Sequence, residues 1–206
     1  MKFRDVKLFM ATLVKHLKWS LPVVCLQAFM LQRTIVKKSS WAGRKDDEAV
    51  MIKRISIIPA FYQVFEKKFG SEKAKDILKE AVIPGSCMEQ WDLLNQIPKD
   101  EGNSLDRLKR YFTEMNTRGV GRFNESKPVR SDDQVFHEQC TKCMYYNFMQ
   151  EAGTPEITQI FCESDLVFFP EAFPNLEFHR GDSPQNTLAY GRDHCDYIFE
   201  KKIENQ

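Results

Sequence analysis

Residues 187–199, TLAYGRDHCDYIF, give the clearest indication of the fold class. Apolar and polar side chains alternate toward the end of this stretch, which is typical of a half-buried β-strand. In a strand, Cys195 shares one face with Tyr197 and Phe199, whereas His194 and Asp196 point to the other face. We therefore expect a strand over Thr187–Phe199, with Cys195 facing the core.

The chain before Gly119 has a helical periodicity instead. Phe61, Phe65 and Phe69 recur at the spacing of one helix face, and Gly70 follows them as a stop signal. Further helices are expected over residues 71–83, 88–96 and 104–116, with Pro84-Gly85 ending the first of these three. About five helices should therefore precede the sheet.

Both kinds of pattern occur after Gly119. Val135–Gln139 and Leu176–His179 predict strands, and residues 142–152 predict a helix. Another helix is expected to begin at Thr154-Pro155 and to end before Pro170. The prediction is an α+β fold, an N-terminal helical array followed by a small antiparallel sheet with helices packed on it. We expect a single domain over residues 1–206, mainly helical over 1–118 and α+β over 119–206.

Composition excludes several classes of protein. The 206 residues are 42% apolar and 29% charged, which is ordinary for a globular chain and argues against a disordered or collagen-like one. The net charge of +1 hides an asymmetry, because residues 132–206 carry 14 acidic and 5 basic residues whereas residues 1–131 carry 15 and 25. Neither a helix-turn-helix pattern nor a concentrated basic face points to nucleic acid as a partner.

The N-terminus contains two apolar runs, Leu8–Val14 and Leu21–Leu31, and the longer has 11 residues. A membrane-spanning helix needs about 20, so we expect two helices packed on the core, no stable membrane insertion and a cytoplasmic protein. The alternative is a basic amphipathic segment that lies on an acidic membrane surface or covers a pocket. Its cations are Lys2, Arg4, Lys7, Lys15 and Lys18.

The residues whose side chains are best suited to catalysis or metal binding lie in the last third of the chain. They form three groups: His137-x2-Cys140-x2-Cys143, Cys162-x2-Asp165 and His194-Cys195-Asp196. In a reducing compartment such thiols are core residues, metal ligands or nucleophiles rather than disulfides. On a helix, Cys162 and Asp165 share a face because they are three residues apart.

These groups resemble the family of L-2-amino-thiazoline-4-carboxylic acid hydrolases. The resemblance covers residues 135–200, and Met144 stands where the family pattern has a proline. Cys143, Cys162, Asp165, Gly191, Cys195 and Asp196 fall on family positions. The stretches that carry it are Cys143-Met144-Tyr145-Tyr146, Gly153-Thr154-Pro155-Glu156, Phe161-Cys162-Glu163-Ser164-Asp165 and Thr187–Phe199.

The resemblance implies a hydrolase acting on a non-peptide C–N bond of a small cyclic amidine or thiazoline-like substrate. The name-giving reaction opens the ring of 2-amino-thiazoline-4-carboxylate to give N-carbamoyl-cysteine. Such a reaction needs a nucleophile at the C=N carbon, a proton donor and an acid that holds the cationic nitrogens.

We expect the catalytic groups to converge in space. The expected catalytic residues are Cys162, Asp165, Cys195, Cys143 and His137, and the expected substrate-binding residues are Asp196 and His194. In this hypothesis a thiolate, Cys162 before Cys195, attacks the carbon. Asp165 then binds the cationic nitrogens, and His137 or His194 transfers the proton. A lysine or arginine from the basic N-terminal part would bind the substrate carboxylate.

Two alternatives remain open at this point. No resident cofactor is expected, but zinc is possible because His137, Cys140, Cys143, Cys162 and Cys195 offer enough ligands for a tetrahedral site. The chain is also similar to vinyl-4-reductase-like domains, in which case it would be a sensor or carrier that binds a small molecule without turnover. A homo-oligomer is possible in either case.

Overall fold

The computed structural model describes residues 3–99 and 104–202. The chain forms two compact units that interleave along the sequence. Unit 1 comprises residues 1–86 and 147–161, and unit 2 comprises residues 87–146 and 162–206. The prediction of one domain over the whole chain stays a prediction.

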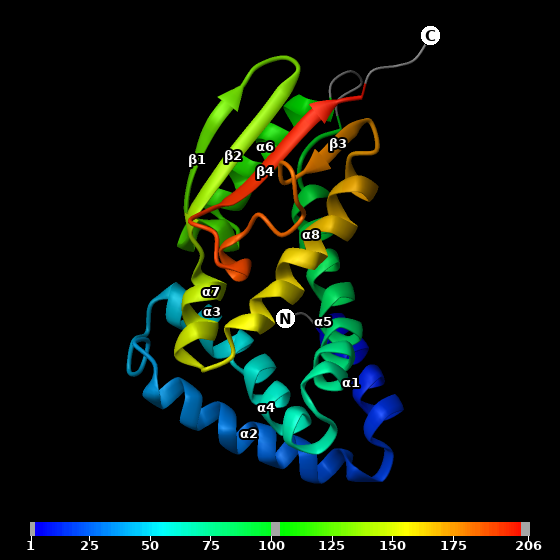
Figure 1. The fold of residues 1–206 in the computed structure, drawn as a ribbon, viewed down its shortest axis with the longest axis vertical. Helices are drawn as coiled ribbons and strands as arrows, with labels where there is room; N and C mark the ends of the chain where they lie inside the picture. Colours follow the sequence, from blue (N-terminus) through cyan, green and yellow to red (C-terminus); the bar gives the residue numbers. More distant parts are fainter. Residues whose placement is uncertain (1–2, 100–103, 203–206) are drawn as a thin grey trace. The chain divides into compact units, whose positions relative to one another are not determined.

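Unit 1 is helical (Figure 1). Its helices are α1 (Phe3–Leu17), η1 (Lys18–Ser20), α2 (Leu21–Lys38), α3 (Asp47–Ile55), α4 (Ile57–Phe69), the first part of α5 (Ser71–Leu94), most of α7 (Met144–Glu151), η3 (Pro155–Ile157) and the start of α8 (Thr158–Ala172). Asp46 begins α3 by accepting the Ala49 backbone N–H. As expected, α4 ends at Gly70, which has a positive φ of 84° that favours glycine.

Buried aromatic residues hold unit 1 together. Phe61 and Phe65 are almost wholly buried, and the Phe9 ring meets Phe61 edge to face at 5.4 Å. One helical stretch, Val6–Lys38, is long and apolar enough to cross a membrane by length and composition, and only 17% of its most apolar window is buried. The expectation of a cytoplasmic protein without membrane insertion therefore remains a prediction.

Unit 2 is a four-stranded antiparallel sheet with helices on one face (Figure 1). Its strands are β1 (Glu125–Ser131), β2 (Val135–Lys142), β3 (Leu176–His179) and β4 (Cys195–Lys201), in the order β1-β2-β4-β3. The remaining elements of unit 2 are the end of α5, α6 (Ser104–Thr117), η2 (Val120–Phe123), the start of α7, most of α8 and η4 (Leu188–Tyr190).

The core of unit 2 is aromatic. Phe112 of α6 stacks on Phe169 of α8 at 5.9 Å and meets Phe136 of β2 and Phe199 of β4 at 5.0 and 5.6 Å. Each such pair adds about 0.5–1.5 kcal/mol beyond the burial of its area. These contacts fix α6 and α8 against the sheet, which is the α+β fold that the sequence predicts.

Three boundaries differ from the sequence prediction. Helix α5 continues through Pro84-Gly85 and absorbs the separate helix expected after them, and α8 continues through Pro170 to Ala172. The last strand begins at Cys195 rather than at Thr187, because Leu188–Tyr190 form a 3₁₀ turn that Gly191 ends with a φ of 81°. Six α-helices precede β1 in the described ranges, against about five expected.

Candidate active site

Helix α8 supplies the first two side chains of the candidate site. Cys162 and Asp165 lie one turn apart, so both project from one face of the helix, as the sequence predicts. Cys162 is half-buried, and 16% of the Asp165 side chain remains exposed. Both therefore keep some access to solvent, which a reacting group needs.

Arg180 supplies the counter-charge. It directly follows β3, and its side chain is fully buried. One terminal nitrogen, Nη2, donates to Asp165 Oδ2 at 2.8 Å, and the other, Nη1, donates to the backbone oxygen of Asp196 at 3.0 Å. The guanidinium lies 4.5 Å from the ring centre of Tyr197, a cation–π distance. Its Nε has no hydrogen-bond acceptor within residues 3–99 and 104–202.

Asp165 has two further partners in unit 2. The Tyr197 hydroxyl donates to Oδ2 at 3.4 Å, and the Gln90 amide donates to Oδ1 at 3.5 Å. Gln90 in turn accepts a hydrogen bond from Tyr111 at 3.1 Å, which orients its amide. Burial raises the pKa of Asp165, and the Arg180 charge offsets only part of that effect. A carboxyl group with a raised pKa is a stronger base, as general acid–base catalysis requires.

The cysteines gather around this ion pair. Cys195 of β4 pairs directly with Cys140 of β2, and both are buried. Cys143 lies near enough to Cys162, Cys195 and Cys140 for a charge on any of them to affect its pKa, and Cys162 lies likewise near Asp165, Cys195 and Arg180. The structure therefore brings Cys143, Cys162, Asp165 and Cys195 into one cluster in unit 2, although their catalytic roles stay predictions.

The thiols of this cluster have raised pKa values. Burial raises the pKa of Cys162 to about 12, against a partial offset from Arg180. Burial likewise raises the pKa of Cys195 to about 12, although its sulfur accepts the Leu188 backbone N–H at 3.2 Å. Burial also raises the pKa of Cys143 well above its ordinary value. A thiolate nucleophile at neutral pH needs a lowered pKa, whereas burial shifts the pKa of these thiols in the opposite direction.

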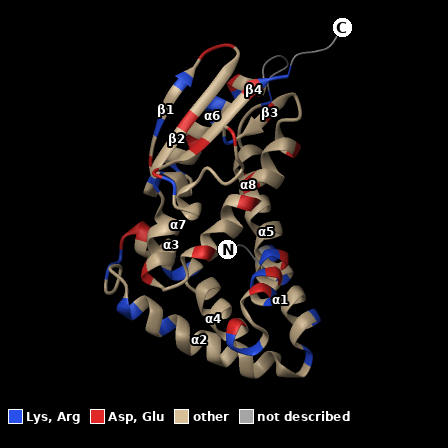
Figure 2. Ribbon diagram, viewed as in Figure 1, with Lys and Arg blue, Asp and Glu red and all other residues tan. Residues whose placement is uncertain are grey.

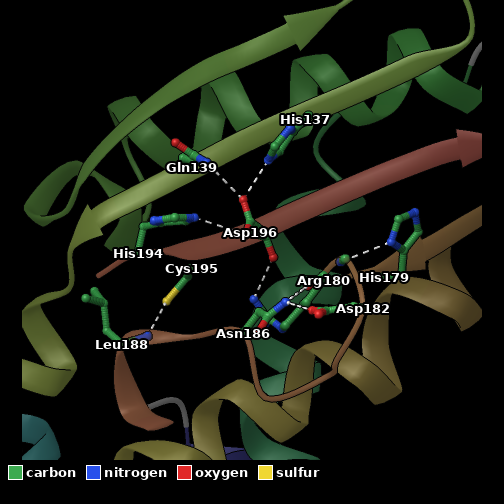
Figure 3. A network of polar contacts seen from close by, with 11 residues as sticks. His137, Gln139, His179, Arg180, Asp182, Asn186, Leu188, His194, Cys195 and Asp196 are labelled. Atoms are coloured by element: carbon green, nitrogen blue, oxygen red, sulfur yellow. Dashed lines mark hydrogen bonds and ion pairs between the residues drawn. The ribbon is translucent and has the colours of Figure 1, made fainter. Parts of the chain in front are cut away.

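Asp196 forms a second polar cluster on the opposite face of the sheet (Figure 3). One carboxylate oxygen accepts from Gln139 at 3.1 Å and lies 2.7 Å from His137 Nε2, and the other lies 3.2 Å from His194 Nε2. Partial burial acts to raise the pKa of Asp196, but the hydrogen bonds from His137 and Gln139 outweigh it and lower the pKa. This cluster orients the carboxylate and both imidazoles.

The two clusters are separated by β4 itself. Tyr197 contacts Phe112 of α6 and Phe169 of α8, and Cys195 lies on the same face of β4 because side chains alternate along a strand. Asp196 faces outward with His137 and His194 (Figure 3). The structure thus does not place His137, His194 or the Asp196 side chain beside Cys162, where the sequence hypothesis needs a proton carrier. Only the backbone oxygen of Asp196 reaches the inner cluster, through Arg180.

The ligands that the sequence offers for zinc do not all lie on one face of the sheet. No group of three or more histidine, cysteine, aspartate or glutamate side chains is arranged to hold a metal ion in the described parts of the chain. His137 lies on the outer face with Asp196, while Cys195 and Cys140 lie on the inner face. The ligands proposed from the sequence are therefore divided between two faces.

Sequence reasoning missed Arg180, Tyr197 and Gln90 as site residues. It assigned the carboxylate-binding cation to the basic N-terminal part, whereas the buried guanidinium beside Asp165 is Arg180 of the acidic last third. The sequence pattern could have indicated Arg180, because this residue continues the alternation of Leu176 and Phe178 and therefore points to the same face of the sheet.

Comparison with known proteins assigns the chain to a family. The model of the L-2-amino-thiazoline-4-carboxylic acid hydrolases matches residues 49–199, which include every residue of the inner cluster. Comparisons with curated proteins and with solved structures gave no match. Membership implies ring-opening hydrolysis of 2-amino-thiazoline-4-carboxylate, at the carbon of its C=N bond, by a hydrolase that acts on cyclic amidines. The chain belongs to the L-2-amino-thiazoline-4-carboxylic acid hydrolase family.

Proposed function

We propose that the Asp165–Arg180 pair is the centre at which this chain hydrolyses 2-amino-thiazoline-4-carboxylate. The observation that carries the proposal is a buried ion pair at 2.8 Å whose carboxyl group keeps solvent access and a raised pKa. Structural ion pairs usually lower the pKa of their carboxyl group, so a raised value in a partly open site favours a catalytic role.

The pair complements the charges of this substrate. The ring carries an amidine-like cation and a carboxylate, so it needs one acceptor and one donor close together. Asp165 accepts from the cationic nitrogens, and the positive charge of Arg180 beside it favours binding of the carboxylate. Tyr197, which donates to Asp165, holds that carboxyl group in position.

The reaction needs proton transfers that one carboxyl group can provide. Water adds to the carbon of the C=N bond while Asp165 takes its proton, and the ring nitrogen is left protonated. The carbonyl group of the product then forms as the ring carbon–sulfur bond breaks, and Asp165 gives its proton to the departing sulfur. The ionised Asp165 takes up the proton that the hydroxyl group loses and releases it to solvent. From the cationic substrate and water, the products are N-carbamoyl-cysteine with a free thiol and one proton, so atoms and charges balance.

Water is a better nucleophile here than Cys162. A thiol with a pKa of about 12 is ionised to only about one part in 10⁵ at pH 7. The basic carboxyl group one helical turn away instead suits the activation of water. In this proposal Cys162 and Cys143 line the site and exclude bulk solvent, and the outer histidines take no part.

The first prediction concerns Asp165→Asn. The purified chain is incubated with 2-amino-thiazoline-4-carboxylate, and N-carbamoyl-cysteine is identified by mass while its thiol is titrated. Asp165→Asn should lower kcat by about 10²–10⁴, the usual contribution of general acid–base catalysis. Asp133→Asn, in the exposed β1–β2 turn, is the matched control and should keep the parent rate. Parent-like turnover by folded Asp165→Asn would exclude the proposal.

A further inference from the structure

The outer face of α2 is an exposed apolar stripe. Val23, Leu26, Phe29 and Met30 are between 52% and 62% exposed, and Trp19, just before the helix, is 97% exposed. Val23, Leu26 and Met30 follow the three- and four-residue spacing of one helix face. Soluble chains rarely leave so many large apolar side chains together in water, so the stripe indicates a binding surface.

The opposite face of α2 is already occupied. Val24, Ala28 and Ile35 are buried, and α2 packs on α4 within unit 1. The helix is therefore apolar on two sides, one against its own unit and one toward solvent. Packing of the unit accounts for the first side only.

The charges next to the stripe are positive. Arg33 and Lys37 continue the same helix face, Lys38 follows them, and Lys18 precedes the helix. Residues 6–38 contain no aspartate or glutamate, although the whole chain has 29. In Figure 2, α2 is tan with blue segments and without red ones. An apolar strip flanked by cations complements a lipid surface that carries negative headgroups.

The stripe also lies outside the part of the chain that the family shares. The family match begins at residue 49, after α2 has ended at Lys38. The hydrolase part of the chain therefore does not account for this apolar face. A separate function for the N-terminal helices is consistent with that division.

We propose that the outer face of α2 binds the surface of an anionic lipid membrane, with Trp19, Leu26 and Met30 entering the headgroup region. The helix lies along the surface rather than crossing it. A crossing helix would have to withdraw Val24, Ala28 and Ile35 from the unit, and the 3₁₀ turn at Lys18–Ser20 interrupts the helical stretch.

The test is cosedimentation of the full chain with vesicles. Phosphatidylcholine vesicles containing one third phosphatidylglycerol should bind the parent, and phosphatidylcholine alone should bind it at least tenfold more weakly. Sodium chloride at 0.5 M should weaken the binding, because salt screens exposed charges. Sodium carbonate should release the bound protein, since it does not cross the membrane.

Two variants separate the apolar and electrostatic contributions. Leu26→Glu/Met30→Glu should lower binding at least tenfold, and Arg33→Gln/Lys37→Gln should lower it about tenfold or more. Val129→Glu, at an equally exposed valine of β1, is the matched control and should bind as the parent does. Circular dichroism checks that each variant is folded.

Three outcomes would overturn the proposal. In the first, the parent stays in solution with both kinds of vesicle. In the second, bound protein resists carbonate, which would indicate a spanning helix. In the third, vesicles do not bind the chain but the chain forms a dimer that Leu26→Glu/Met30→Glu dissociates, which would assign the stripe to a second copy.

Discussion

Arg180 keeps a full positive charge away from solvent, and its neighbours explain how. Burial acts to lower the pKa of Arg180, but the combined effect of Tyr197, Asp165 and Cys162 is larger and raises it. The guanidinium therefore stays protonated. A buried charge without a partner costs several kcal/mol, which is why Asp165 and the backbone oxygen of Asp196 both contact it. The pair therefore holds β3, α8 and β4 in one arrangement around the candidate site.

The sequence could place Arg180 on the inner face but could not name its partner. Strand alternation follows from local geometry, whereas the approach of α8 to the end of β3 depends on the packing of Phe168, Phe169 and Phe178. Cys162 and Asp165 were predictable as neighbours because one helix holds both. His137 was placed with them by proximity in sequence to Cys140, which carries no information about the face of the sheet.

The thiols give a residue-scale prediction. In the folded chain Cys162 and Cys195, with pKa values of about 12, should react with iodoacetamide at pH 7 about 10³-fold more slowly than in the unfolded chain. The rate should rise about tenfold for each pH unit from 7 to 10 without a plateau, as mass spectrometry of the peptides would show. A plateau at Cys162 below pH 9 would indicate an activated thiolate.

The same pKa values set the sign of the pH dependence of stability. Unfolded thiols ionise near pH 8.5, whereas these folded thiols keep their protons up to about pH 12. Their contribution to stability is therefore complete below about pH 8.5 and is lost as the pH rises from there toward 12.

At the scale of elements, the sequence predicted whether a segment is a helix or a strand better than it predicted where that element begins and ends. The strands Leu176–His179 and the one beginning at Val135 lie where alternation places them. Pro84 and Pro170 were expected to stop helices, but α5 and α8 continue because buried residues follow each proline, including Leu94 and Ala172. Tertiary packing outweighs the loss of one backbone hydrogen bond, and a local signal cannot show this.

Pro84 gives the element-scale prediction. It lies inside α5 with an exposed side chain, so Pro84→Ala restores a backbone donor and removes no buried contact. An interior proline costs a helix about 3 kcal/mol relative to alanine, and the greater freedom of the unfolded chain offsets part of the gain. The free energy of unfolding should rise by about 1–2 kcal/mol in urea titrations. A decrease would mean that the helix needs a bend at this position.

At the scale of the whole molecule, the two proposals concern two parts of the chain. The inner cluster lies in unit 2 and in the range shared with the hydrolase family, whereas the proposed lipid-binding stripe lies in unit 1 and outside that range. The charges of the sequence follow the two units, because unit 1 has 17 basic and 10 acidic residues whereas unit 2 has 13 basic and 19 acidic ones. We therefore predict that substitutions in the stripe change lipid binding without changing hydrolysis, and that substitutions at Asp165 do the reverse.

The kcat of Cys162→Ser with 2-amino-thiazoline-4-carboxylate tests most directly whether Asp165 activates water at this site. Serine keeps the size of the side chain and removes the thiol, so a nucleophilic cysteine would lose on the order of 10³ or more in rate. Activation of water by Asp165 predicts a kcat within about tenfold of the parent, with no covalent adduct in the intact mass of the parent during turnover. A fall of 10³ or more in folded Cys162→Ser, together with an adduct at Cys162 in the parent, would contradict it.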